Sequence, residues 1–284
     1  MGALSPVLEV DLKIKFWGVR GSIPVPGEST LRVGGNTSCV ELRAGGQLLI
    51  FDMGTGARAL GASLLSALPV RAHVFLSHLH HDHTQGIPFF APCFIPGCDL
   101  SFYGAERKED TLQAMLYRVF DYPYFPIPMP KMAAAKSFTA LSEGQRVEVA
   151  PGLAVTCLKL NHPDGCFGYR VEAVENGVKK VFAFCTDTEH SPEADAHVRT
   201  LAAQADAFVY DSQYTVEEYP AKVGWGHSTT AEAAQLAKEA GAKRLFLFHH
   251  DPTHNDEKVF AMEAQARTIF PATQAAVEGL EIEV

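Results

Sequence analysis

The sequence predicts an α/β protein built from layers of strands and helices. Short strand-like runs alternate with runs of helical spacing along the whole chain, and no repeat or low-complexity linker divides its 284 residues. The composition, 47% hydrophobic and 20% charged, is ordinary for a globular protein and is sufficient for a large core. We therefore expect a single domain over residues 1–284.

The first half is expected to start as a β-meander that contains one helix. Glycine-rich turns at residues 34–36 and 45–46 separate its apolar runs, as turns between strands do. A helix over about residues 58–68 separates two of the strands. The expected strands cover residues 8–17, 39–43, 47–52 and 72–77.

The second half repeats the pattern of strands followed by helices. Its clearest helix covers residues 230–240, because Thr229 is a good N-cap, Glu232 completes a capping box, and Gly241 stands where a helix-ending glycine belongs. The expected strands cover residues 154–160, 168–174, 179–184, 207–210, 244–248 and 280–284.

An insertion over residues 107–132 separates the two halves. Residues 108–120 have helical spacing, and four prolines between residues 123 and 130 then break regular structure and stiffen a loop. The loop presents Tyr122, Tyr124 and Phe125, which could stack on a nucleobase if the insertion folds over a site as a lid. Packing against a core edge or a dimer partner is the equal alternative.

Charge and targeting features restrict the partners. With 24 basic and 33 acidic residues the net charge is −9, which argues against a long nucleic-acid partner. The N-terminus has no cationic start and no apolar signal region, and no uncharged stretch approaches the roughly 20 residues of a membrane span. The six cysteines form no Cys-x-x-Cys pair. We expect a soluble, cytoplasmic protein with reduced thiols and no membrane partner.

Residues 78–83 read His-Leu-His-His-Asp-His and directly follow the apolar run 73–77. Imidazoles and a carboxylate are ligands that suit zinc, but one turn cannot direct all of them at a single tetrahedral ion. We predict two ions side by side. A histidine-rich surface turn is the alternative, and the preceding strand argues against it because it would hold the loop in place.

Three further residues fall just past the ends of expected strands: His162, Asp187 and His249. If those strands are neighbours and point the same way, these side chains converge with residues 78–83 at one edge of the sheets. The sequence therefore predicts a shared site.

These motifs resemble the metallo-β-lactamase superfamily over nearly the whole chain. The resemblance implies a four-layered αββα sandwich with a dinuclear centre, usually of zinc, with manganese as the alternative. Its signature His-x-His-x-Asp-His is matched here at residues 78–83. Carried over, it implies one ion held by His78, His80 and His162, a second ion held by Asp82, His83 and His249, and Asp187 as the bridge. His250 competes with His249 for the last position, and we favour His249.

The segment 226–234, Gly-His-Ser-Thr-Thr-Ala-Glu-Ala-Ala, resembles the ribonuclease Z and phosphodiesterase branch of the superfamily. In that branch the histidine, here His227, contacts the phosphate or protonates the leaving oxygen, and an upstream carboxylate, here Asp211, assists it. Two ions roughly 3.5 to 4 Å apart can share a hydroxide and clamp the attacking and leaving oxygens at phosphorus. We expect His227, Asp211 and Asp82 to be catalytic, with Asp82 orienting the hydroxide. The alternative for His227 is a cap on the helix start.

Differences between this sequence and ribonuclease Z narrow the range of expected substrates. Only 24 residues separate His162 from Asp187, which leaves no room for the long arm with which many ribonuclease Z enzymes grip tRNA. The N-terminal segments 16–22 and 34–39 resemble the cyclic-nucleotide phosphodiesterases that counter Pycsar defence. We expect a phosphodiesterase acting on small phosphodiesters, cyclic nucleotides above all, and the resemblance implies a homodimer.

Other activities remain open. The first alternative is a thioester or lactone hydrolase of the glyoxalase II kind, since a fold does not determine its reaction. A tRNA 3′-processing endoribonuclease and a non-catalytic metal-binding module follow.

Further polar residues have weaker expectations. His254 and Asp256 could support a ligand, and Arg20 and Arg170 could meet phosphate. We expect His73, His81, His190 and His197 to be core or surface residues that bind no metal.

Overall fold

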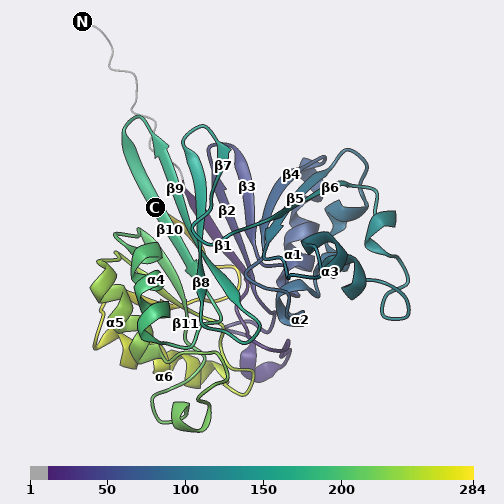
Figure 1. Ribbon diagram of the computed structural model, residues 1–284. Coiled ribbons are helices and arrows are strands. Elements are labelled where there is room, and N and C mark those ends of the chain that lie inside the picture. Colours follow the sequence, from purple (N-terminus) through teal and green to yellow (C-terminus); the bar gives the residue numbers. More distant parts are fainter. Residues whose placement is uncertain (1–11) are drawn as a thin grey trace, which may run out of the picture.

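The structure is a computed structural model that describes residues 12–284, so the start of the predicted strand 8–17 lies outside it. Within the described residues, two seven-stranded sheets stand face to face (Figure 1). The first sheet has the order β14-β1-β2-β3-β4-β5-β6. Its strands are β1 (Lys13–Gly18), β2 (Cys39–Ala44), β3 (Gln47–Phe51), β4 (Arg71–Phe75), β5 (Asp99–Gly104), β6 (Ala135–Ala140) and β14 (Glu281–Glu283).

The second sheet has the order β13-β12-β11-β10-β9-β8-β7. Its strands are β7 (Arg146–Ala150), β8 (Leu153–Leu160), β9 (Cys166–Glu175), β10 (Val178–Cys185), β11 (Ala207–Asp211), β12 (Leu245–Phe248) and β13 (Thr273–Ala275). Strand β9 pairs antiparallel with both β8 and β10, and β10, β11 and β12 pair in parallel. Strands β8, β10, β11 and β12 therefore all run the same way, and their carboxyl ends meet at one edge.

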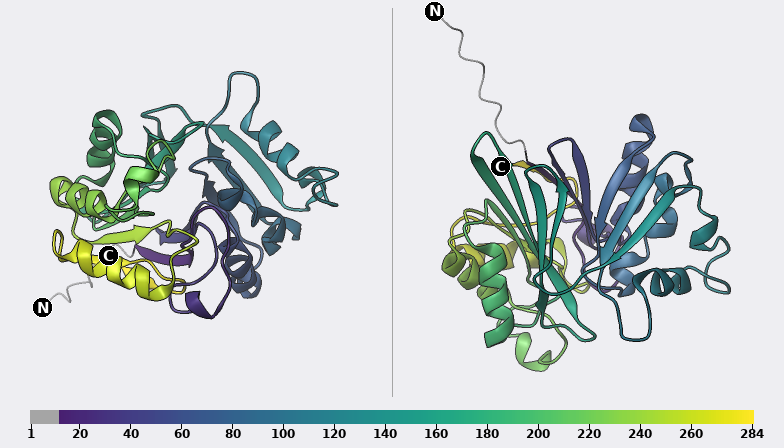
Figure 2. Two further views of the ribbon diagram at one scale, coloured as in Figure 1. Left: turned by 90° about the horizontal axis from the view of Figure 1, so that it is seen from below. Right: turned by 45° about the horizontal axis from the view of Figure 1, so that its top comes forward.

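Helices cover the outer faces of both sheets (Figure 2). Helices α1 and α3 lie on the first sheet, and α4, α5 and α6 lie on the second. The α-helices are α1 (Gly56–Ser63), α2 (His81–Thr84), α3 (Leu112–Val119), α4 (Pro192–Ala202), α5 (Thr230–Ala240) and α6 (Asp256–Arg267). The short 3-10 helices are η1 (Glu28–Thr30), η2 (Leu64–Ala67), η3 (Ile87–Phe89), η4 (Ala91–Phe94), η5 (Met129–Lys131) and η6 (Tyr219–Ala221). The predicted αββα sandwich is confirmed.

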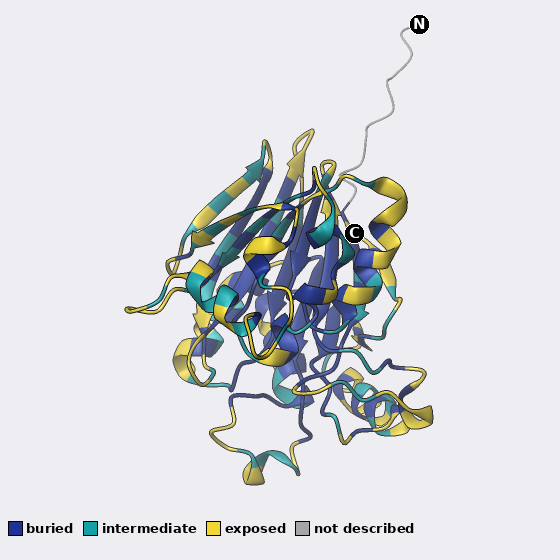
Figure 3. Cartoon of the chain, turned by 90° about the vertical axis from the view of Figure 1, so that its right-hand side faces the viewer, coloured by how far each residue is buried: buried dark blue, intermediate teal, exposed yellow. Residues whose placement is uncertain are grey.

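The apolar core fills the spaces between the layers. Aromatic rings of opposite sheets meet in the middle, where the ring centroid of Phe51 lies 5.4 Å from Phe182 and that of Phe16 lies 6.1 Å from Phe248. Two further clusters lie beneath the helices on either side. Figure 3 shows the strands largely buried and the outer turns of the helices exposed. Two rigid sheets therefore support whatever their edge loops carry.

Several predicted elements match the structure closely. Helix α5 has the predicted bounds, the Thr229 hydroxyl accepts from the Glu232 N–H, and Gly241 is left-handed with φ 64°. The helix predicted over 58–68 ends early as an α-helix and continues as η2, because Pro69 forces Leu68 into an extended backbone. The helix predicted from residue 108 starts only at α3, because Thr111 is its N-cap and accepts from the Ala114 N–H.

Candidate metal centre

The loop of residues 78–83 leaves the first sheet after β4 and closes in the single turn of α2. The structure turns His78, Asp82 and His83 inward, where they are buried, and leaves His81 exposed. The turn is held in place by Gly86, which packs against the backbone of residues 53 and 54, where a Cβ would collide. The sheet therefore fixes the position of the loop.

One group of ligand atoms consists of His78, His80 and His162. The Nε2 of His162, which follows β8, lies 3.2 Å from the Nδ1 of His80. The ring centroid of His78 lies 4.3 Å from that of His80 and 4.8 Å from that of His162. These three imidazoles come from both sheets and face a common point.

A second group consists of Asp82, His83 and His249, together with Asp187. The Oδ2 of Asp82 lies 3.2 Å from the Nε2 of His83 and 3.3 Å from the Nε2 of His249, which follows β12. All four residues are buried. This group also joins the two sheets.

Asp187, at the end of β10, faces both groups. Its Oδ1 lies 3.8 Å from the Nε2 of His78 and of His162. Its Oδ2 lies 3.3 Å from the Nε2 of His83 and of His249. One carboxylate oxygen thus points to each group, which is the arrangement a bridging ligand needs.

The residues fit divalent ions. Within the described residues, the buried Nε2 atoms of His78 and His83 have no hydrogen-bond partner, which is rare for buried polar atoms, and a cation bound between them would supply one. Burial lowers the pKa of His78 well below its usual value, so it is neutral and able to bind a metal. Burial also lowers the pKa of His83, but the carboxylates of Asp187 and Asp82 outweigh it and raise that pKa. A donor set of imidazoles and carboxylates suits zinc.

Further partners, which the sequence did not reveal, orient the ligands. The Nδ1 of His83 lies 2.7 Å from the Oδ2 of buried Asp52, and the Ser77 N–H donates to the other oxygen of Asp52. The Nδ1 of His249 lies 2.9 Å from the Gln213 Oε1. Such partners leave Nε2 free to bind a metal. Asp52 follows a buried strand, a local signal that sequence reasoning passed over.

Three of these residues have left-handed backbones. The φ angles are 59° at Asp52, 54° at Asp187 and 60° at His249. Such angles are uncommon outside glycine and cluster at functional sites, where the surroundings hold them in place. Each angle turns the chain sharply at the end of a strand, so that the side chain returns over the edge of the sheet.

His227 and Asp211 form a pair beside both ligand groups. The Nδ1 of His227 lies 2.7 Å from the Oδ2 of Asp211, and its ring centroid lies 5.1 Å from that of His162 and 4.9 Å from that of His249. Burial lowers the pKa of His227, but the adjacent Asp211 carboxylate outweighs it and raises the pKa to about 9. The alternative of His227 as a helix cap is wrong, since Thr229 caps α5.

His250 points away from the ligand groups. Its Nε2 donates to the Ala276 carbonyl oxygen at 2.9 Å. Burial lowers its pKa to about 3. The structure therefore places His249, and not His250, in the cluster of candidate metal ligands. Gly21 explains part of this choice, because a Cβ there would collide with the His249 ring.

Four weaker expectations are wrong, because these side chains bond backbone and carboxyl groups away from the two ligand groups. Arg20 is fully buried and donates to the carbonyl oxygens of Gly34, Asp251 and His254, so it cannot meet a phosphate. Arg170 likewise donates to the carbonyl oxygens of Leu201 and Ala203 at the end of α4. The His254 Nε2 lies 3.1 Å from Glu218, and Asp256 accepts from the backbone N–H groups of residues 32 and 33.

Two adjoining cavities open at the ligands. One, of about 270 Å³, is lined by ligands of both groups, by His227 and by the half-exposed Trp225. The other, of about 500 Å³, lies between the metal loop and α3 and reaches Tyr124 of the insertion. His80 and His81 line both, so a molecule bound at the ligands can extend into the larger cavity.

Residues 49–250 match the sequence model of the beta-lactamase superfamily domain. The chain belongs to this superfamily. Its superfamily membership and the converging ligands make it a metal-dependent hydrolase. A ribonuclease Z from Acaryochloris marina (strain MBIC 11017) is 25% identical, in an alignment covering 96% of this chain and 98% of that protein.

Solved structures show the same superfamily fold. The metallo-beta-lactamase fold protein YhfI from Bacillus subtilis superposes with a TM-score of 0.73 at 21% identity, covering 97% of this chain and 100% of that one. A diphosphatase of the PhnP family gives a TM-score of 0.71 at 19% identity, covering 96% and 98%. Among the described residues, no helix is long and apolar enough to cross a membrane.

Proposed function

We propose that the protein is a dinuclear-metal phosphodiesterase that hydrolyses small phosphodiesters, cyclic nucleotides above all. The observation that carries the proposal is the His227–Asp211 pair, whose imidazole lies next to one histidine of each ligand group. A hydrolase of thioesters needs no acid at this place, because a thiolate leaves readily. An alkoxide leaving from phosphorus does need one.

His78, His80 and His162 would hold one ion, Asp82, His83 and His249 the other, and Asp187 would bridge them. Two divalent ions, zinc above manganese, would supply Lewis acidity and a water of lowered pKa. Asp82 has a second task, which is to orient the attacking water. Its Oδ2 is held by the Ser22 N–H at 2.7 Å, so the carboxylate has a fixed direction.

His227 delivers the proton to the leaving oxygen. Asp211 holds the Nδ1–H of the imidazolium, so the Nε2–H remains available to the substrate. Asp211 also accepts from the N–H groups of Gln213 and Ser228, which fixes its own orientation. The Asp211 carboxylate raises the pKa of His227 and so favours the imidazolium form that a general acid requires.

A small substrate agrees better with the chain than a tRNA does. The segment between His162 and Asp187 consists of the hairpin β9–β10 and its short connections, without an arm. The net charge of −9 opposes a long polyanion. The ribonuclease Z relative favours tRNA 3′-processing as the second candidate.

The substrate class is tested with purified protein loaded with zinc or manganese. We expect hydrolysis of a 2′,3′- or 3′,5′-cyclic nucleotide, and no cleavage of a precursor tRNA with a 3′ trailer or of S-lactoylglutathione. Efficient cleavage of the precursor tRNA would establish the second candidate instead. Rapid hydrolysis of the thioester, with no hydrolysis of either phosphodiester, would overturn the proposed phosphodiesterase activity.

The role of His227 as the acid is tested with two substrates that differ in their leaving group. We expect His227→Ala to lose about 10²- to 10⁴-fold on a cyclic nucleotide, whose leaving group is an alkoxide, and far less on bis-p-nitrophenyl phosphate. Metal content is measured in parallel, and His197→Ala, whose imidazole bonds the Lys159 carbonyl oxygen, is the control. Equal losses on both substrates, or a loss that follows metal content, would refute the acid role.

A further inference from the structure

The 500 Å³ cavity beside the metal loop extends away from His78 and His80 toward the insertion. Its walls come from the end of β4, from the metal loop, from the segment after β5, from α3, from Tyr124 and from the turn after His162. Its volume is that of a small-molecule site. Any group attached to a phosphate at the ligands can therefore enter it.

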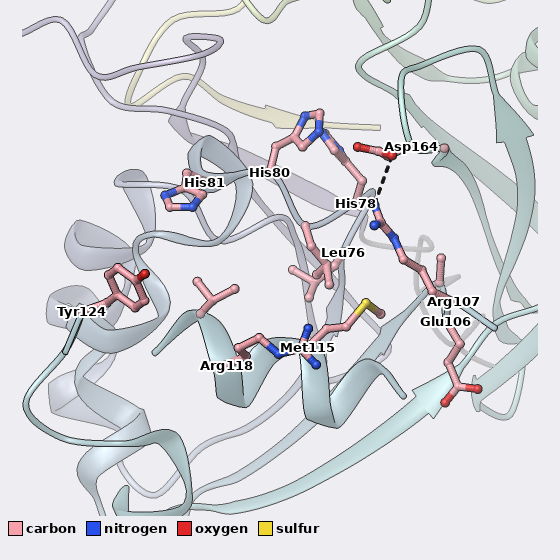
Figure 4. Close-up of a pocket in the computed structure, with 14 residues that line it drawn as sticks. Leu76, His78, His80, His81, Glu106, Arg107, Met115, Arg118, Tyr124 and Asp164 are labelled. Carbon is pink, nitrogen blue, oxygen red and sulfur yellow. Dashed lines mark ion pairs between the residues drawn. The ribbon is translucent and has the colours of Figure 1, made fainter. Parts of the chain in front are cut away.

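The walls of this cavity are largely apolar. Leu76 and Met115 lie in the middle of the lining side chains, with Tyr124 on one side and Arg107 on the other (Figure 4). Val119 and the half-buried Leu79 add further apolar surface. Tyr124 is 83% exposed and its ring is free of the core, so it can close on a flat molecule.

Both arginines of the cavity are already paired with carboxylates. The Nη2 of Arg107 lies 3.4 Å from the Oδ1 of Asp164, and the Nη2 of Arg118 lies 2.6 Å from the Oδ1 of Asp110. The carboxylate of Glu106 points away from the other labelled side chains (Figure 4). Among the described lining residues, each guanidinium thus has a carboxylate partner. The cavity offers no excess positive charge to a second phosphate.

We infer that this cavity binds an uncharged aromatic substituent of the phosphodiester, of nucleobase size, stacked between Tyr124 and the apolar wall. The inference rests on the proposed function and adds the substrate class: one phosphodiester group carrying one flat, uncharged ring system. Stacking of a base on an aromatic side chain strengthens binding by about 5- to 150-fold. Selectivity for nucleoside esters over simple alkyl esters follows, without added affinity for polyanions.

The test compares two esters with one leaving group: thymidine 5′-(p-nitrophenyl phosphate) and methyl p-nitrophenyl phosphate. Because both release p-nitrophenolate at the same centre, the ratio of their kcat/KM values isolates the cavity. We expect a ratio of about 10 to 100 in the wild type. Met115→Trp, which fills the cavity, and Tyr124→Ala, at an exposed position, should each reduce the ratio at least fivefold. Gln113→Trp, on the exposed side of α3, should leave it unchanged.

The inference would be overturned if the ratio of kcat/KM values is near one in the wild type, or if it is unchanged in both cavity variants. If neither ester is hydrolysed, the proposed function fails. Calorimetry with thymidine 5′-monophosphate then tests separately whether the cavity binds the base. Binding that Met115→Trp abolishes supports it, and absence of binding overturns it. A 3′-phosphorylated form of the thymidine ester that is preferred more than tenfold would also contradict it, because that preference requires free positive charge.

Discussion

Asp52→Asn should weaken metal binding at one of the two positions, because it moves the proton of His83 from one ring nitrogen to the other. The Ser77 N–H donates to the Oδ1 of Asp52 at 2.8 Å, and the Nδ1 of His83 lies 2.7 Å from its Oδ2. Because a backbone N–H can only donate, the amide oxygen of the variant stays with Ser77 and its NH₂ group faces His83. The Nδ1 must then accept, so the proton moves to Nε2, the nitrogen that faces Asp82 and Asp187.

The magnitude follows from the bond that is lost. A hydrogen bond to a charged group contributes about 1.5 to 3 kcal/mol, and 1.4 kcal/mol corresponds to a factor of ten in affinity. Substitutions behind a metal ligand typically cost about 10- to 100-fold. We expect a loss of that size for one ion, with the other retained. The fold should persist, since asparagine tolerates the left-handed backbone at φ 59°.

The assay is a competitive zinc titration against a chromophoric chelator, combined with metal analysis. Asp206→Asn is the matched control, because Asp206 is also a buried carboxylate and bonds the Val181 N–H and the Lys243 ammonium far from the ligands. Two zinc ions bound by Asp52→Asn at wild-type affinity would refute the reasoning. An equal loss in Asp206→Asn would show a general effect of removing a buried carboxylate.

Three further predictions concern packing, pH and capping. Gly21→Ala should lower zinc affinity at least tenfold in the same titration, because its Cβ would collide with the His249 ring. Burial raises the pKa of Glu218, but hydrogen bonds from a backbone N–H, the Lys258 ammonium and an imidazole outweigh it and lower the pKa to about 2. Its stabilising contribution is therefore fully present above about pH 4.5 and is lost as the pH falls through about 2, so urea unfolding of metal-free protein should show that Glu218→Gln destabilises several-fold less at pH 2.5 than at pH 6. Thr229→Ala should cost about 1 kcal/mol of unfolding free energy by removing the α5 cap, and a loss below about 0.3 kcal/mol would contradict it.

The sequence predicts that the candidate ligand side chains cluster, because each follows a run whose apolar pattern is local. His162, Asp187 and His249 lie one or two residues after the ends of β8, β10 and β12, and those strands are apolar enough to be recognised one by one. Their convergence needed only the assumption that the strands run the same way, which the sheet confirms. The layered fold followed from the same runs.

What the sequence did not reveal depends on pairing between distant segments. Asp52 reaches His83 because β3 and β4 are parallel neighbours, and Gln213 reaches His249 because β11 and β12 are. Neither pairing is visible in one residue's neighbourhood. Strand β6 was missed because it is a half-exposed edge with few large apolar residues, and α6 because its apolar residues are sparse. The larger cavity depends on how the insertion packs, which no local pattern encodes.

The left-handed backbones at Asp52, Asp187 and His249 bear on attempts to transplant this centre. A designer who copies only the side chains onto the ends of ordinary strands would aim them along the strand direction and outward. The transferable unit is a strand together with its reversed final residue and the neighbouring sheet that holds it there. Screening such grafts by the φ angle at these three positions would reject unsuitable scaffolds before any metal is added.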